Sequence, residues 1–303
     1  MGTKKTGRFW HEVVKNRWAY IFISPFYILF TVFSLGPMLF SIYMSMATWK
    51  GLGPIKFVGL KNFTYLFGPG GKAFWQSIST GFILFVMYVP LMTFAAIVLA
   101  VILNSQKVRG FRFFRTLIFA PYVTSMIAAG ITFRLVFENQ GGLANILLNL
   151  VELPSIPWLE SVWGMRVSLC LLIIWGWLGY NMVIMLAGLQ TIPSELTEAA
   201  RVDGATPVQT FFKITIPMLR PVIAFSVILS TIGTFGLFNE VMAFSPRGSI
   251  GGPMRATITP MVHIYRTAFT TFRYGRASAM SYVFAALILI LTLLQNKYAN
   301  RED

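Results

Sequence analysis

The chain has 303 residues, of which 56% are hydrophobic and only 12% are charged. A soluble domain carries about 25% charged residues, so the 25 basic and 10 acidic residues found here are too few to cover a water-soluble globule of this length. The net charge of +15 is spread between long apolar runs and forms no single basic patch, which argues against a nucleic-acid-binding domain. Composition therefore argues against a soluble enzyme and against a disordered chain, and it favours a protein that lies in a membrane.

Long stretches without Asp, Glu, Lys or Arg predict the membrane topology. They are 18–49, 73–106, 116–133, 167–194, 221–239 and 277–296. A helix rises ~1.5 Å per residue, so about 18–20 residues cross the ~30 Å hydrocarbon core. Lipid forces every backbone polar group to bond internally, and the runs lack the alternation of β-barrel strands. The sequence predicts an all-α integral membrane protein with six transmembrane helices in a single domain, 18–296.

The charges between the apolar runs predict the orientation. The first 17 residues contain five basic side chains, the 107–115 loop contains four basic side chains and no acid, and the 137–163 loop contains three glutamates and no Lys or Arg. Because positive loops stay in the cytoplasm, segments 1–17 and 297–303 are expected there. The outer loop 243–274 disagrees with this rule, since it holds four arginines. The first apolar run is also far longer than the ~7–15-residue core of a signal peptide.

Prolines interrupt several of the predicted spans. Pro25 and Pro37 lie in the first, Pro90 in the second and Pro121 in the third. Each removes a helix hydrogen bond and bends the helix. Two interpretations remain open: ordinary kinks that neighbouring helices compensate, or bent helices that leave a cavity near the middle of the bilayer.

Segment 193–217, between the fourth and fifth spans, predicts two short helices. Ser194 is expected to be the N-cap of the first helix, and Gly204 suits the left-handed position just past its end. Thr206 is expected to cap the second helix with Pro207 at its first position, and Pro217 is expected to end it.

The first of these helices offers a small-residue surface at Ala199 and Ala200, which Glu198, Arg201 and Asp203 flank, and the second is expected to expose Phe211 and Phe212. The segment is either a loop packed on its own bundle or a short amphipathic helix that docks in a partner's groove.

The same segment resembles the EAA loop of ABC importer permeases. The matching residues are Glu198-Ala199-Ala200-x-x-Asp203-Gly204-Ala205, continuing to Ile216-Pro217, and the extended form is similar to the maltose-type, sugar-importing branch. Further similarity lies in Val58-Gly59-Leu60-x-Asn62-Phe63 and in Gly251-Gly252-Pro253. The chain departs from the family before that last triplet, where residues 244–250 replace a short Leu-Thr element.

The resemblance implies that Glu198, Ala199, Ala200, Asp203, Gly204 and Ala205 couple the chain to a separate ATPase. The partners it implies are a second homologous permease, two ATPase subunits and an extracellular solute-binding protein, with ATP and Mg bound by the ATPase and no cofactor bound by this chain.

The residues agree with a non-catalytic subunit. The string nearest to a phosphate-binding loop, residues 66–73, has Leu66 in place of its first glycine and Ala73 in place of its hydroxyl. No metal site is predicted, because Cys170 is the single cysteine and His11 and His263 are far apart. Glu240 is the only acid at a helix boundary, without a histidine near it in the sequence, so no catalytic residue is predicted.

Polar and aromatic residues within the fourth and fifth spans are candidates for the substrate path. They are Trp175, Gly179, Asn181, Phe235, Asn239 and Glu240. Aromatic stacking and amide or carboxylate hydrogen bonds suit a sugar, and the resemblance implies a sugar site on these helices and the sixth, although such residues also serve helix packing. These two spans carry no Lys or Arg at mid-membrane, which favours a neutral sugar or oligosaccharide over a phosphate. The alternatives are a permease for glycerol 3-phosphate or another polyol, and an ATP-independent secondary transporter.

Overall fold

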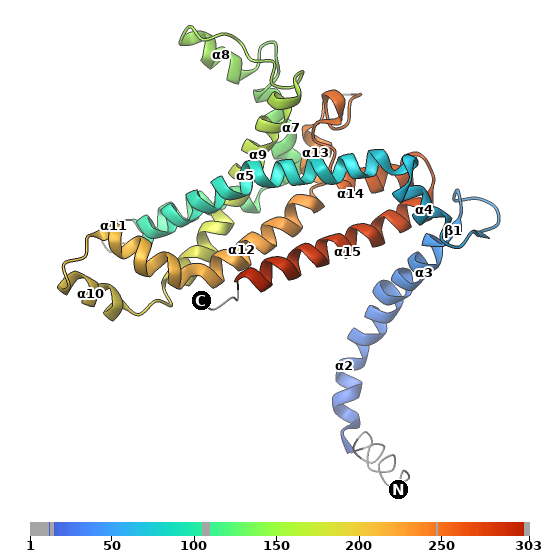
Figure 1. Cartoon of the computed structure of the whole chain (residues 1–303), viewed down its shortest axis with the longest axis horizontal. Helices are drawn as coiled ribbons and strands as arrows, with labels where there is room; N and C mark the ends of the chain where they lie inside the picture. Colours follow the sequence, from blue (N-terminus) through green and yellow to red (C-terminus); the bar gives the residue numbers. More distant parts are fainter. Residues whose placement is uncertain (1–11, 13–14, 105–109, 247, 300–303) are drawn as a thin grey trace.

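The structure is a computed structural model of the chain that describes residues 12, 15–104, 110–246 and 248–299 (Figure 1). Most of the predicted N-terminal segment 1–17, part of the tail 297–303 and part of the basic 107–115 loop lie outside the described residues. Arg247 of the outer loop lies outside them as well.

The described elements are α2 (Arg17–Phe30), η1 (Thr31–Leu35), α3 (Gly36–Ser45), β1 (Ala47–Thr48), β2 (Lys56–Phe57), α4 (Lys61–Phe67), η2 (Pro69–Gly71), α5 (Lys72–Asn104), α6 (Phe111–Phe119), η3 (Ala120–Val123), α7 (Met126–Val136), α8 (Leu143–Leu150), α9 (Val162–Leu189), α10 (Ser194–Val202), α11 (Pro207–Thr210), η4 (Phe211–Thr215), α12 (Ile216–Gly236), α13 (Asn239–Phe244), η5 (Pro253–Arg255), α14 (Pro260–Tyr265), η6 (Arg266–Thr270) and α15 (Tyr274–Ala299). The two short strands pair antiparallel, with Ala47 opposite Phe57.

The membrane-spanning helices agree with the predicted all-α membrane class. Within the described residues, five helices are long and apolar enough to cross a bilayer: Arg17–Ser45, Pro69–Asn104, Val162–Leu189, Pro207–Gly236 and Tyr274–Ala299. A sixth span is present if the pair Phe111–Val123 and Met126–Val136 counts as one, and this pair is bent by 93°.

The bend expected at Pro121 in the third span, 116–133, is a full break in the helix between η3 and α7. The backbone of Thr124 is extended and Ser125 caps α7 by accepting a hydrogen bond from the N–H of Ala128. Pro121, which has no N–H, stands in the 3₁₀ turn just before this point. The helical hydrogen bonds therefore stop at this point, and a separate helix, α7, begins after it.

Pro217 does not end the helix that precedes it, contrary to the prediction. The chain stays helical from Pro207 to Gly236, with the π turn η4 directly before Pro217. The wider turn changes the hydrogen-bond register at the position where the proline lacks an N–H. The fifth span consequently begins inside segment 193–217.

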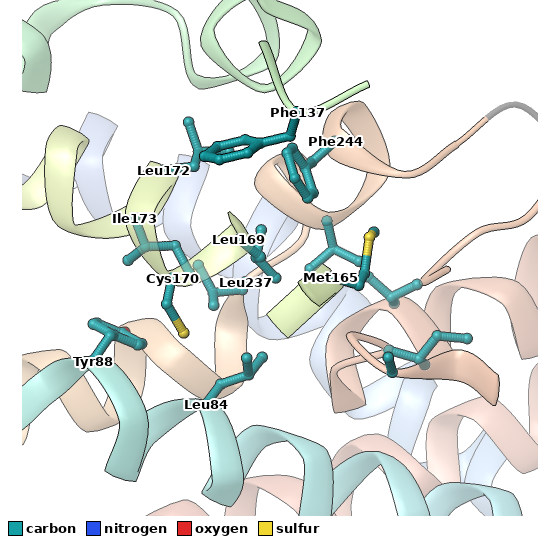
Figure 2. Close-up of a cluster of buried hydrophobic side chains, with 14 of the residues drawn as sticks. Leu84, Tyr88, Phe137, Met165, Leu169, Cys170, Leu172, Ile173, Leu237 and Phe244 are labelled. Carbon is teal, nitrogen blue, oxygen red and sulfur yellow. The ribbon is translucent and has the colours of Figure 1, made fainter. Parts of the chain in front are cut away.

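The apolar core lies where α5 and α9 pack along each other. Figure 2 shows Leu84 and Tyr88 of α5 facing Leu169 and Cys170 of α9, with Leu237 next to them. A second buried cluster lies nearer α10 and is formed by Ala96, Ala100, Leu103, Met182, Met185 and Leu219, among others. These two clusters fix α5, α9 and α12 relative to one another.

Helices α2 and α3 extend away from the other helices (Figure 1). No residue of α2 is buried, and α3 joins the bundle through α15, where the Tyr282 hydroxyl donates a 2.8 Å hydrogen bond to the Met38 carbonyl. This first span therefore presents almost all of its apolar side chains to its surroundings.

The loop 243–274 is folded against the bundle. The Thr259 hydroxyl donates to the carbonyl of Leu237, the Arg166 guanidinium to that of Ala256 at 3.0 Å, and the Arg134 guanidinium to that of Ser245 at 3.2 Å. These bonds satisfy backbone carbonyls of an irregular segment. Its α14 packs against α5 and α15, between α13 and α4 in the view of Figure 1.

Candidate functional site

Helix α10 begins one residue earlier than predicted. Pro193 stands at the N-cap of α10 with an extended backbone, ψ 133°, and no side-chain cap bond forms. Ser194, the predicted cap, is the first helical residue, and its carbonyl accepts a hydrogen bond from the Thr197 hydroxyl. The extended backbone of Pro193 is the non-helical conformation that an N-cap residue adopts.

The end of α10 has the predicted glycine geometry. Gly204 has φ +79°. The N–H of Gly204 donates to Arg201 at 3.1 Å and the N–H of Ala205 donates to Ala200 at 2.8 Å. These two bonds form a Schellman motif, which satisfies the last carbonyls of the helix.

The start of α11 also agrees with its prediction. The side chains of Thr206 and Gln209 form a reciprocal capping box, and Pro207 follows at the first helical turn. Local sequence therefore determines the geometry of the turn between the two helices.

The α10–α11 loop exposes both charged and apolar side chains. Glu198, Ala199, Asp203 and Gly204 are exposed. Ala200 is only 9% exposed because its own chain covers it, and Ala205 is half-buried. The side chains of Val202, Val208 and Phe212 are 87%, 65% and 62% exposed.

Phe211 departs from its prediction, because it packs against the buried cluster around Leu219 and only Phe212 of the pair points outward. The loop is thus anchored on one side and presents an apolar surface on the other.

A cavity of about 290 Å³ lies beside a break between α12 and α13. Its lining residues are Tyr88, Met92, Trp177, Tyr180, Asn181, Leu229, Ser230, Gly233, Gly236, Leu237, Phe238, Asn239 and Glu240. Leu237 has an extended backbone, ψ 120°, which ends α12. Irregular backbone at membrane depth is tolerated where it lines such a cavity. Tyr88 and Met92, which flank Pro90 on α5, form another part of its wall.

Two polar groups in the cavity wall lack partners among the described residues. The indole Nε1 of Trp177 is buried and has no hydrogen-bond acceptor. Glu240 is 7% exposed, and no described side chain donates a hydrogen bond to its carboxylate. An unpaired buried donor costs about 1–3 kcal/mol. The hydrogen-bonding capacity of both groups is therefore unused within the described residues.

Other polar groups in the wall are bonded to the protein. The Asn181 amide donates to the Trp177 carbonyl at 3.0 Å and accepts from the Ser226 hydroxyl at 2.6 Å, and the Tyr88 hydroxyl bonds to that of Thr234. These groups hold the wall in place.

The aromatic rings along the cavity form one cluster. Tyr180 stacks on Tyr122 at 4.7 Å between ring centroids, and Trp177 lies edge-on to Tyr122 at 5.4 Å. Tyr122 belongs to η3, at the break of the bent pair. The break between η3 and α7 and the break between α12 and α13 thus both lie close to the aromatic residues of α9.

The structure brings together three of the six residues proposed for the substrate path. Asn181, Asn239 and Glu240 line the cavity. Phe235 is 2% exposed and lies against Gly81 of α5.

The other two proposed residues also lie outside the cavity wall. Gly179 allows close approach of α6, because a Cβ there would come within 2.1 Å of the Ile118 carbonyl. Trp175 packs against Phe133 in a separate surface groove.

Sequence reasoning did not select Tyr88, Ser230 and Phe238. Tyr88 lies four residues before Met92, and this helical spacing around Pro90 was a usable signal.

The fold and these two sites define the class of the protein: a membrane subunit with an aromatic cavity between its spans and an exposed two-helix loop at one end. Residues 65–301 match the family described as "Binding-protein-dependent transport system inner membrane component". The chain belongs to this family, whose members are non-catalytic permease subunits.

Individual relatives match the sequence of this chain over most of their length. The chain is 39% identical to the lactose transport system permease protein LacF of Rhizobium radiobacter, covering 95% of this chain and 94% of LacF. It is 35% identical to the arabinooligosaccharides transport system permease protein AraP of Halalkalibacterium halodurans, covering 91% and 85%. A chain of a bacterial ABC transporter for alginate import has the same fold, with a TM-score of 0.81 at 22% identity over 97% of this chain and 99% of that one.

Proposed function

We propose that this chain conducts a neutral sugar or oligosaccharide through the membrane as the permease subunit of an ATP-driven importer. The observation that carries this proposal is the aromatic cavity beside the α12–α13 break, whose wall combines the rings of Tyr88, Trp177 and Tyr180 with the polar side chains of Asn239 and Glu240. Aromatic rings that stack on a sugar ring and groups that bond its hydroxyls suit this ligand class. LacF and AraP, by their names, transport such sugars.

The charge of the wall favours a neutral ligand. None of the residues that line the cavity in the described part of the chain is Lys or Arg, and Glu240 is acidic. An anionic ligand would lose its hydration without gaining a cation from this chain, and it would also lie close to a carboxylate. A sugar phosphate such as glycerol 3-phosphate is therefore the less suited ligand.

The α10–α11 loop is proposed to dock on an ATPase subunit. The exposed Glu198, Ala199, Asp203 and Gly204 form its contact surface, while Ala200 and Ala205 hold the turn beneath them. The exposed Val202, Val208 and Phe212 support this role, since a partner that covers them removes apolar surface from water.

The proposed assembly contains a second homologous permease, two ATPase subunits that bind ATP and Mg, and an extracellular solute-binding protein. The unburied helix α2 supports a permease partner, because its apolar surface is free to pack on a neighbouring subunit. The α10 end of the bundle lies in the cytoplasm in this arrangement, together with both chain termini.

The assembly is tested by purifying the tagged chain from its native membrane in mild detergent. The proposal expects an ATPase and a second permease to copurify in fixed ratio. Recovery of the chain alone, with substrate uptake driven by an ion gradient in the absence of ATP, would instead establish a secondary transporter.

The ligand class is tested in two steps. The ligand retained by the cognate binding protein is identified first, and labelled uptake of that ligand is then measured with Asn239→Ala and Glu240→Gln. The expected result is a sugar and reduced uptake at normal membrane levels, with Trp175→Phe as the matched control outside the cavity. A retained sugar phosphate, or normal uptake by both cavity variants, contradicts the proposal.

A further inference from the structure

A second pocket, of about 360 Å³, lies at the end of the bundle opposite α10 (Figure 1). Three parts of the chain form it: the turn at 48–50 after α3, the region of Val58 to Tyr65 that includes α4, and the start of α15. It is separate from the aromatic cavity, with which it shares no lining residue.

Four cations line this pocket and no acid does. They are Lys50, Lys61, Arg273 and Arg276. The Arg276 guanidinium lies 3.8 Å from the ring centroid of Tyr65. The described residues contain no carboxylate paired with any of the four. The N-terminus of α15, a helix of 26 residues, adds the positive end of its dipole. The pocket therefore favours an anion.

The walls of the pocket are fixed by close packing. The Asn62 amide is buried and donates to the carbonyls of Ser45 and Ala47 at 2.9 and 2.8 Å. A Cβ on Gly275 would come within 1.9 Å of the Ala47 carbonyl, so the start of α15 lies directly on the turn. The backbone segments that carry the cations are thus packed together around the pocket.

The pocket lies at the membrane surface. The first span ends at Ser45 and the last begins at Tyr274, so both meet the water boundary here. The ring of Trp49 lies 5.3 Å from that of Tyr274, and aromatic residues gather at this level of membrane proteins.

Apolar side chains are exposed next to the lining residues. Phe57 is 63% exposed, Leu60 is 61% exposed and Phe272 is 52% exposed, and each is adjacent in sequence to a residue of the pocket wall. Cations in a pocket with apolar groups around it match a ligand with an anionic head and hydrocarbon tails.

We propose that this pocket binds the phosphate headgroup of an anionic phospholipid in the leaflet at that end of the bundle. The four cations hold the headgroup, and the exposed apolar side chains contact the acyl chains. The bound lipid stabilises the junction between the first and last spans, which meet around the pocket.

The test is native mass spectrometry of the whole purified transporter, reconstituted in nanodiscs of phosphatidylcholine with phosphatidylglycerol. The variant is Lys61→Gln combined with Arg273→Gln, since both side chains are exposed and removing them leaves the packing intact. The control is Lys56→Gln combined with Lys297→Gln, which removes the same charge outside the pocket.

The proposal expects the transporter to retain phosphatidylglycerol in preference to phosphatidylcholine, and the pocket variant to retain about tenfold less of it. The control variant and added inorganic phosphate should leave retention unchanged. Equal loss in both variants, no preference between the two lipids, or displacement by inorganic phosphate would overturn it. A pocket variant that retains phosphatidylglycerol but no longer associates with its binding protein would also overturn it.

Discussion

The Ser226 hydroxyl donates a 2.6 Å hydrogen bond to the side-chain oxygen of Asn181 and so joins α12 to α9 beside the aromatic cavity. The amide nitrogen of Asn181 donates in turn to the Trp177 carbonyl, one helical turn earlier. Asn181 therefore fixes the part of α9 that carries Trp177, and its own bonding capacity is largely used by the protein. We interpret it as a residue that positions the cavity wall.

This pair predicts coupled stability effects. Asn181→Ala and Ser226→Ala should each lower the stability of the purified transporter, because each leaves the other side chain without its partner. The double variant should be less destabilised than the sum of the two, with a coupling of about 0.6 kcal/mol and at most about 1.7 kcal/mol, the mean and upper values for hydrogen bonds between membrane helices. Unfolding of the three variants in one detergent measures it. Strict additivity would show that the two residues do not interact.

The sequence predicts the helices and the turn around Gly204 because both depend on local information. Apolar runs long enough to cross a bilayer determine the spans, and a glycine before Thr206-Pro207 determines where one short helix ends and the next begins. Pro121 predicts a bend in the third span but not the extended backbone at Thr124, because an extended residue inside an apolar run has no strong local signal.

The lining of the cavity could be predicted only in part. Trp175 and Trp177 are two residues apart on α9, so about 200° separates their directions around the helix. Composition identifies both as aromatic residues in a span, but only the packing of α5, α9 and α12 determines which one faces the cavity. For the same reason, Phe235 and Gly179 proved to be packing neighbours of other helices.

Trp177→Phe should weaken substrate recognition without weakening the fold. The substitution keeps an aromatic ring but removes the indole N–H, which has no acceptor among the described residues. If the substrate accepts a hydrogen bond from this group, its loss should raise the KM for uptake about threefold to tenfold, the worth of one hydrogen bond. Transport assays at a series of substrate concentrations measure this change.

Trp175→Phe is the matched control, since the ring of Trp175 lies against Phe133 and outside the cavity. It should leave the KM unchanged. Equal effects of the two substitutions on KM, or a fall in melting temperature of the Trp177 variant with normal uptake, would contradict the role given to this indole.

His263 should make stability depend on pH. Burial, together with the smaller effect of the Arg255 and Arg266 charges, lowers its pKa from 6.5 to about 4. Between these two values the unfolded chain binds a proton at His263 and the folded chain does not. The free energy of unfolding should therefore decrease as the pH falls from about 6.5 towards 4.

His263→Gln separates this contribution from the titration of the carboxylates. The difference in stability between the original chain and the variant should be constant above about pH 7 and should shift in favour of the variant at lower pH. Thermal unfolding in detergent at several pH values gives the two curves. Parallel curves down to pH 4 would mean that His263 takes up its proton equally in both states.

Gly204→Leu should uncouple the loop from the ATPase without preventing membrane insertion. At φ +79° a side chain with a Cβ costs about 1–2 kcal/mol, and a Cβ placed there meets no atom within 4 Å of its own chain. The strain therefore acts on the backbone, where it disturbs the Schellman bonds donated by the N–H groups of Gly204 and Ala205. Membrane levels should stay normal while copurified ATPase and uptake fall several-fold.

Gly204→Asn, which tolerates the left-handed conformation, should keep most of both activities. Normal uptake by the leucine variant would show that the loop only packs on its own bundle, and equal loss in the two variants would assign the effect to side-chain bulk at the docking surface.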